Sequence, residues 1–203
     1  MRALFFAFAV VLGACGPSAP DSVVNGIVVI TQDSPSTDFK ALRTFALPTQ
    51  VKLVAQAPPG PKDWTADVPN LLSAVEANLV AKGYAKHSGT ATSADFGVTV
   101  SAILGTEEEY FTGVWCDYCF WYPGTPYCGA QCSWDFSYIG DYRYGTLIIE
   151  LHEFTTPPPD AGARVKTHWS AALYSVLPDT GYDAAKAKEA IDRAFSQSPR
   201  VAR

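Results

Sequence analysis

Two stretches decide the fold: Gly145-Thr146-Leu147-Ile148-Ile149-Glu150-Leu151-His152 and Val165-Lys166-Thr167-His168-Trp169-Ser170-Ala171-Ala172-Leu173-Tyr174. Both are rich in β-branched and aromatic residues, which is typical of strands. The run Pro157-Pro158-Pro159 lies between them and cannot continue a hydrogen-bonded ladder, because proline lacks a backbone N–H. The two stretches are therefore predicted to form an antiparallel pair joined by a protruding turn.

Three further stretches are predicted to be strands. Val23 to Ile30 is a β-branched run, Thr44 to Leu47 is a short apolar run, and Phe96 to Leu104 alternates apolar and small residues. Such alternation indicates a strand with one face on the core. Together with the first pair, these stretches predict a sheet of about five strands.

Two helices are predicted. The first covers residues 68–82, because its apolar residues recur every three or four positions and Gly83 follows its end. The second covers residues 184–197, with Asp183 as its N-cap and Glu189–Arg193 as an exposed ion pair. Helices covering one face of a sheet give an α+β domain. The predicted architecture is a mainly antiparallel sheet with both helices on one face.

The first residues of the chain are predicted to be an export signal. One positive residue, Arg2, precedes an apolar run that ends in small residues and a cysteine. This layout is typical of a secretory signal. The run is too short to cross a bilayer, which takes about 20 apolar residues. Residues 1–14 are therefore predicted to be a signal peptide that is removed.

Cys15 is predicted to be the lipid-modified first residue of the mature protein, because Leu12-Gly13-Ala14-Cys15 resembles the lipobox of bacterial lipoproteins. An ordinary secreted protein with a chance cysteine is the alternative. Each buried lipid methylene contributes about 0.8 kcal/mol, so several acyl chains would hold the protein on a membrane. Residues 15–22 would then be a short tether. Gly16 replaces the aspartate that retains enteric lipoproteins on the inner membrane, which favours the outer membrane facing the periplasm.

Composition and charge indicate a single domain over residues 23–199. Hydrophobic residues make up 48% of the chain and charged residues 17%, which is enough for a packed core. The net charge of −5 gives no basic footprint, so nucleic acid is not an expected partner. The sequence has no nucleophile elbow, zinc-protease helix, phosphate loop or dinucleotide fingerprint. We therefore expect a non-enzymatic protein without a cofactor.

Four cysteines, Cys116, Cys119, Cys128 and Cys132, remain once Cys15 carries lipid. Four thiols in an oxidising periplasm are expected to form two disulfides, with three possible connectivities. The pairs Cys119–Cys128 and Cys116–Cys132 lie almost symmetrically about the turn signal Pro123-Gly124, which favours a nested, hairpin-like pairing. Two alternatives stay open: a zinc site made by the four thiolates, and a redox-active Cys-x-x-Cys pair.

The segment from residue 107 to residue 144 is predicted to be an insertion that surrounds these cysteines with aromatic side chains. Its candidate binding surface consists of Trp115, Tyr118, Phe120, Trp121, Tyr122, Tyr127 and Trp134. Such side chains give large contact areas and keep a polar tip for water. The segment therefore predicts a surface for an envelope protein, a glycan or the lipid interface. The alternative is that a disulfide-pinned flap uses these side chains to cover the sheet.

The histidines give a weaker signal. His152 and His168 fall on strands predicted to be neighbours, and Glu150 and Glu153 lie close in sequence, so a weak metal or acid–base site is conceivable. Isolated histidines on strands are more often exposed, or hydrogen-bonded without chemistry. We therefore predict no metal site at these residues.

The order of several short motifs resembles the bacterial lipoproteins built around domain of unknown function 4136. The matching motifs are Asp38-Phe39, Arg43-Thr44-Phe45-Ala46-Leu47, Leu79-Val80-Ala81-Lys82-Gly83-Tyr84, Ala94-Asp95-Phe96-Gly97-Val98-Thr99-Val100, Gly145-Thr146-Leu147-Ile148-Ile149-Glu150-Leu151, Thr167-His168-Trp169-Ser170-Ala171 and Phe195-Ser196-Gln197-Ser198-Pro199. The resemblance covers residues 24–199 and rests on the order and spacing of these motifs. It implies a cell-envelope lipoprotein with an α+β body and supplies no catalytic residues. The insertion at 107–144 departs from the family pattern.

Overall fold

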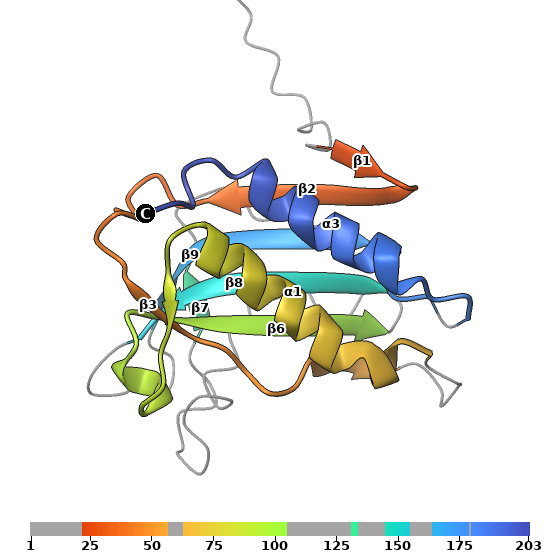
Figure 1. The fold of residues 1–203 in the computed structure, drawn as a ribbon, viewed down its shortest axis with the longest axis horizontal. Helices are drawn as coiled ribbons and strands as arrows, with labels where there is room; N and C mark the ends of the chain where they lie inside the picture. Colours follow the sequence, from red (N-terminus) through yellow and green to blue (C-terminus); the bar gives the residue numbers. More distant parts are fainter. Residues whose placement is uncertain (1–21, 57–62, 105–130, 134–144, 155–163, 179) are drawn as a thin grey trace, which may run out of the picture.

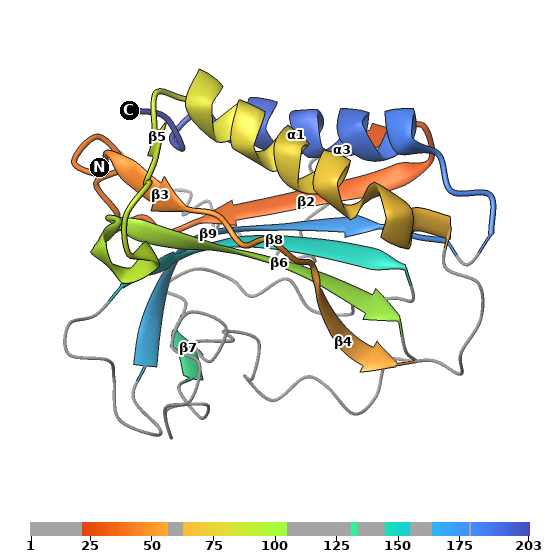
Figure 2. The ribbon, with the colours of Figure 1, turned by 60° about the horizontal axis from the view of Figure 1, so that its bottom comes forward.

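Two helices lie side by side on one face of a mixed β-sheet in the computed structural model (Figures 1 and 2). The structure describes residues 22–56, 63–104, 131–133, 145–154, 164–178 and 180–203. The strands are β1 (Ser22–Val24), β2 (Ile27–Asp33), β3 (Thr44–Ala46), β4 (Lys52–Gln56), β5 (Ala85–Lys86), β6 (Phe96–Leu104), β7 (Gln131–Ser133), β8 (Thr146–Glu153) and β9 (Arg164–Tyr174).

The antiparallel pair predicted from the proline-separated stretches is confirmed as β8 and β9. Their register places Leu147 opposite Leu173 and Leu151 opposite Trp169. The strand order is β1-β2-β9-β8-β6-β3-β5, with β4 beside β6 and β7 beside β9. The predicted pair therefore lies at the centre of the sheet.

The predicted α+β sheet with two helices is present, but the prediction of about five strands is too low, and parallel pairs accompany the antiparallel ones. The described residues form nine strands, and β3–β5, β3–β6, β4–β6 and β7–β9 are parallel pairs. The two-residue β5 and the short β4 are too brief to leave a periodic signal in the sequence. The sheet is therefore mixed, with an antiparallel centre.

The first predicted strand is in fact a hairpin. Asn25 and Gly26 have φ angles of 50° and 81° and separate β1 from β2. An Asn-Gly pair with both φ angles positive is the preferred two-residue hairpin connection. The β-branched residues on both sides hid this turn within a single predicted strand.

Both predicted helices are present. Helix α1 (Val68–Ala81) follows a short 3-10 helix, η1 (Asp63–Asp67), and α3 covers Ala184–Ser196. A second short 3-10 helix, η2, covers Ala91–Ser93. Asp183 caps α3 as predicted, because its side chain accepts from the backbone N–H groups of residues 185 and 186. None of the described helices is long and apolar enough to span a bilayer.

The apolar stripe of each helix packs on one face of the sheet. The core contains Leu71, Val75 and Leu79 of α1 and Ile191 and Phe195 of α3. The central strands contribute every second residue to this core. These residues are Phe96, Val98, Val100, Ala102 and Leu104 of β6, Leu147, Ile149 and Leu151 of β8, and Trp169, Ala171 and Leu173 of β9. We call this the helix face. The intervening residues point to the second face, because side chains alternate along a strand.

The residues after α3 bind three parts of the fold together. Ser198 Oγ accepts a 2.9 Å hydrogen bond from Trp169 Nε1, and its carbonyl accepts one from Lys82 Nζ. The backbone N–H of Arg203 donates to the carbonyl of Lys82. Arg200 pairs with Asp33 at the end of β2. The last residues therefore hold the end of α1 and the end of β2 to the central sheet.

Candidate functional site

Most of the predicted site residues lie outside the described residues. These are Cys15, Cys116, Cys119, Cys128, Trp115, Tyr118, Phe120, Trp121, Tyr122, Tyr127 and Trp134. The exception is Cys132, which lies in β7 opposite Val165 of β9. Figure 2 shows β7 on the side of the sheet away from the helices. The backbone at Cys132 is therefore paired with the central sheet.

The second face of the central sheet is buried and combines polar residues with the apolar Ile103, Ile148 and Ala172. Its polar residues on β6, β8 and β9 are Thr99, Ser101, Thr146, Glu150, His152, His168 and Ser170, and an irregularity in the β8–β9 register places Thr167 opposite His152. None of them is more than 6% exposed, although both described helices lie on the opposite face. Buried polar groups are costly unless they are hydrogen-bonded. We therefore take this face as the chemically distinctive region of the described domain.

Thr99, Glu150 and Ser170 form one row across this face. The strand registers pair Thr99 with Glu150, and Glu150 with Ser170. Within the described parts of the chain, the hydroxyl oxygens of Thr99 and Ser170 have no hydrogen-bond partner. A buried polar group left without a partner costs about 1–3 kcal/mol. The row is thus a polar strip that the surrounding strands satisfy only in part.

His152 lies in the next row of β8. Its Nδ1 is 3.3 Å from Thr167 Oγ1, and its Nε2 is 3.6 Å from Glu150 Oε2. Burial, with a smaller contribution from nearby His168, lowers the pKa of His152 from 6.5 to about 3. The short distance to Glu150 would favour a charged imidazole, but complete burial outweighs it. His152 is therefore neutral at pH 7, and its contact with Glu150 is not an ion pair.

His168 is tied to the loop that follows β2. Its Nδ1 lies 2.9 Å from Oγ1 of Thr37, and both residues are buried. The backbone N–H of Ser34 donates to the carbonyl of His168 in the same region. Among the described residues, no three His, Cys, Asp or Glu side chains are arranged to hold a metal ion. His168 therefore links β9 to this loop.

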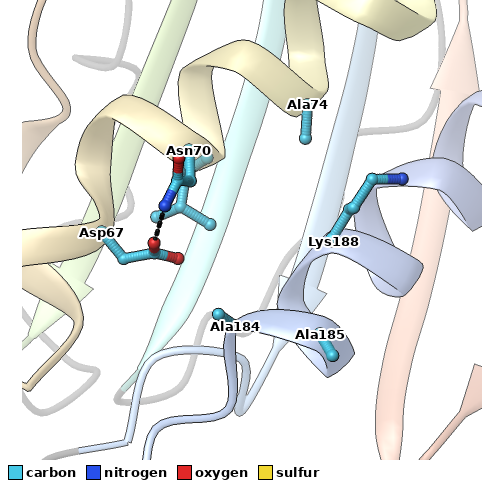
Figure 3. A pocket seen from close by; sticks show the side chains of 7 residues that line it. Asp67, Asn70, Ala74, Ala184, Ala185 and Lys188 are labelled. Carbon is cyan, nitrogen blue, oxygen red and sulfur yellow. Dashed lines mark hydrogen bonds between the residues drawn. The ribbon is translucent and has the colours of Figure 1, made fainter.

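A shallow hollow of about 260 Å³ lies between the first turns of α1 and α3 (Figure 3). Its walls are mainly apolar, and Asp67, Asn70 and Lys188 supply its polar groups. Each polar group already has a partner. Asp67 accepts from Asn70 and from the hydroxyl of Tyr182, and Lys188 pairs with Asp192. The hollow therefore offers contact area but no reactive group.

The comparison with family models gives one match, described as "Domain of unknown function (DUF4136)", over residues 29–200. The chain belongs to this family. The DUF4136 match begins in β2 and ends after α3, so it contains both helices and the central sheet. The comparison with curated proteins finds no match.

A solved structure of the same family has a similar fold. A DUF4136 family protein, BT2437, from Bacteroides thetaiotaomicron VPI-5482 is 25% identical, with a TM-score of 0.63 over 88% of this chain and 99% of that chain. Two PelC dodecamer structures from Paraburkholderia phytofirmans are each 15% identical and cover 87% of this chain and 99% of theirs, with TM-scores of 0.42 and 0.40.

Sequence reasoning missed the polar second face as a unit. The sequence places His152, His168 and Glu150 near one another, but it does not predict that Thr99, Ser101 and Ser170 share the same buried face with them. The available signal was the alternation itself: Glu150 and His152 alternate with Ile149 and Leu151 near the end of β8. A polar residue at every second position of a strand buried on both faces indicates an internal polar layer.

Proposed function

We propose that this DUF4136 protein is a non-enzymatic lipoprotein of the cell envelope, anchored through Cys15, that binds a protein or glycan partner. The binding surface would be the aromatic segment at 107–144, held by disulfides among Cys116, Cys119, Cys128 and Cys132. The DUF4136 domain would serve as the rigid support for that segment.

The anchor rests on the N-terminal sequence, which is the observation that carries the proposal. A short apolar run ends in Leu12-Gly13-Ala14-Cys15, and a brief Gly/Pro/Ser stretch follows it. The first described strand, β1, lies at the edge of the sheet and, among the described strands, pairs with β2 alone. A tether can leave an edge strand without crossing the fold, so this position suits a membrane anchor.

The binding role is supported by the place where the aromatic segment meets the domain. Cys132 lies in β7, whose three residues pair in register with Arg164, Val165 and Lys166 of β9. β9 also carries Trp169 in the middle of the core. This pairing ties residues 131–133 of the segment to the central sheet, which supports the domain as its point of attachment.

The buried polar face speaks against chemistry in the described domain. Glu150 and His152 are each 2% exposed and His168 is 6% exposed, so a substrate cannot reach them in this conformation. A general acid or base must come within hydrogen-bond distance of its substrate. This supports binding rather than catalysis as the function.

Anchoring is tested by replacing Cys15 with serine in the native bacterium. The parent chain is expected to be cleaved after Ala14 and to sediment with membranes. The Cys15→Ser chain is expected to remain uncleaved at this site or to appear in the soluble fraction. A variant that is still processed after Ala14 and still sediments with vesicles would refute the anchor.

The state of the four cysteines is tested by the intact mass of protein purified from the envelope. Two disulfides remove four hydrogens from the mass, and no metal is retained. Free thiols with bound zinc would instead establish the metal-binding alternative. A disulfide that forms and opens reversibly at a potential near that of the periplasm would establish the redox alternative.

Binding is tested by crosslinking in intact envelopes, followed by capture of the full chain. We expect the captured partner to be lost when Trp115, Trp121 and Trp134 are changed to alanine. The matched control changes Val23 and Val80, which are exposed apolar residues of the described domain, to serine. Equal capture by both variants would overturn the role of the aromatic segment. A chain lacking residues 107–144 removes β7 and is therefore a secondary test.

A further inference from the structure

Basic side chains gather at one end of the domain, where the helices finish. They are Lys40, Arg43, Lys82, Lys86, Arg200 and Arg203. Figure 2 shows β3, β5 and the C-terminus together at this end. We call this surface the basic end.

Three separate parts of the chain are joined to make the basic end. The backbone N–H of Ala85 donates to the carbonyl of Arg43, which places Lys86 beside the start of β3. The backbone N–H of Arg203 donates to the carbonyl of Lys82, and Tyr84 Oη donates to the carbonyl of Phe39, next to Lys40. The grouping is therefore fixed by the fold.

The acidic residues of this end are already engaged. Asp33 pairs with Arg200, Glu76 pairs with Lys86, and Asp95 accepts from the backbone N–H groups of Arg43 and Thr44. Two further acids lie at this end: Asp38, which accepts from the backbone N–H of Lys40, and Glu153, which is opposite Phe96 at the start of β6. The basic side chains outnumber these acids, in a chain whose net charge is −5. The end is thus positive on a protein that is negative overall.

The tether leaves the domain at the same end. Ser22 Oγ donates a 2.5 Å hydrogen bond to Gln197 Oε1, at the end of α3 and next to Ser198, whose carbonyl accepts from Lys82 Nζ. The stretch from Cys15 to Ser22 can span at most roughly 25 Å when fully extended. A lipid on Cys15 would therefore keep Ser22, beside the end of α3, within that distance of the membrane surface.

We propose that the basic end docks on anionic phospholipid headgroups of the membrane that carries the anchor. This inference rests on the proposed lipid anchor. Lys and Arg side chains are attracted to the negative surface of such a membrane, and the attraction fades within a Debye length. Docking would fix one orientation and point the opposite end, with Asp67 and Asp183 at the helix starts, away from the membrane.

The test uses the full lipidated chain in two kinds of vesicle, phosphatidylcholine alone and phosphatidylcholine mixed with phosphatidylglycerol. A water-soluble amine reagent modifies exposed lysines, and mass spectrometry gives the rate at each site. Lys40 and Lys86 report on the basic end, and Lys186 and Lys188 at the start of α3 are the internal control. We expect several-fold slower labelling of Lys40 and Lys86 on the anionic vesicles only, unchanged labelling of the controls, and loss of the protection in about 1 M salt.

A charge variant provides the second measurement. Removing one basic residue should weaken docking roughly fivefold, so changing both Lys40 and Arg203 to glutamine should weaken it about 25-fold and restore fast labelling of Lys86. Changing Lys186 and Lys188 to glutamine alters the net charge equally and should leave the protection intact.

Equal labelling on both kinds of vesicle, or equal protection at both ends of the domain, would overturn the docking proposal. Failure of the anchor itself is recognised separately, because the protein would then not sediment with either kind of vesicle.

Discussion

The indole Nε1 of Trp169, in the middle of the sheet, donates a 2.9 Å hydrogen bond to the hydroxyl of Ser198, which in turn donates to the carbonyl of Ala194. Trp169 is fully buried and Ser198 is 5% exposed. The Ser198→Ala variant leaves the indole N–H buried without this acceptor. We expect it to lower the free energy of unfolding by about 1–3 kcal/mol, measured by urea denaturation. Ser196→Ala, at an exposed position, is the control and should cost less than about 0.5 kcal/mol. Equal losses would contradict the role of this bond.

Asp95 joins the beginnings of β3 and β6. Its Oδ2 accepts from the backbone N–H groups of Arg43 and Thr44 and from Thr44 Oγ1, at 2.7–3.0 Å. The Asp95→Asn change replaces this charged acceptor, so we expect a loss of about 1.5–3 kcal/mol in the free energy of unfolding. Asp38→Asn is the control, because among the described residues the carboxylate of Asp38 accepts a single backbone bond, from Lys40.

The same carboxylate predicts a response to acid. Burial would raise the pKa of Asp95, but the hydrogen bonds from Thr44 and Arg43 outweigh it and hold the pKa below the ordinary 3.8. A lowered pKa means that the carboxylate stabilises the fold above about pH 4 and that this stabilisation is lost as the pH falls further. The difference in stability between the parent and Asp95→Asn should therefore narrow below about pH 4. A difference that stays constant would contradict the prediction.

His152 predicts a second pH dependence, in a higher range. Its pKa is about 3 in the folded chain, against an ordinary 6.5. Between these values the unfolded chain binds a proton that the folded chain does not, so stability falls as the pH falls, by at most about 1.4 kcal/mol per pH unit. Urea denaturation at several pH values should show a flatter profile for His152→Gln than for the parent. Parallel profiles would show that His152 is not the residue that titrates.

Gly145 occupies a position that excludes a side chain. Its φ angle is 78°, and a Cβ atom there would lie 2.7 Å from the carbonyl oxygen of Leu177. Gly145→Ala therefore combines backbone strain with a clash, and we expect a loss of about 2–4 kcal/mol. Gly26→Ala is the matched control, since Gly26 has a φ of 81° with nothing near its Cβ position. Its loss should be about 1 kcal/mol, and similar losses would rule out the clash.

The long helices and strands could be predicted from the sequence, because their apolar residues repeat with a regular spacing over many positions. The pair β8–β9, strand β6 and both helices each extend over eight or more residues of consistent periodicity. Asp183 was also predictable as the N-cap of α3, because the carboxylate of an aspartate directly before a helix can accept hydrogen bonds from the first backbone N–H groups. The family resemblance stated from the order of motifs is confirmed at the level of the domain by the match over residues 29–200.

The wrong secondary-structure predictions come from contacts between residues that are far apart in the sequence, which a local pattern cannot reveal. Strands β4 and β5 exist only because β6 and β3 supply partners from elsewhere in the chain. The predicted pair Glu189–Arg193 is replaced by Lys188–Asp192, because Glu189 instead accepts from Asn25 of the first hairpin. The lipid anchor, the disulfides and the aromatic binding surface stay predictions.

The β1–β2 hairpin has a mechanical consequence if the chain is tethered at its N-terminus. Tension from a membrane would enter the fold at Ser22, the outermost residue of a three-residue strand that has one neighbour. An antiparallel pair of strands that is pulled at one end loses its hydrogen bonds one after another. Here the first contact to break would be the hydrogen bond between Ser22 and Gln197. Separating β1 from β2 as far as Asn25 would lengthen the tether by roughly 10 Å, while β2 stays paired with β9. Under tension, the β1–β2 hairpin would thus open before the rest of the domain is strained.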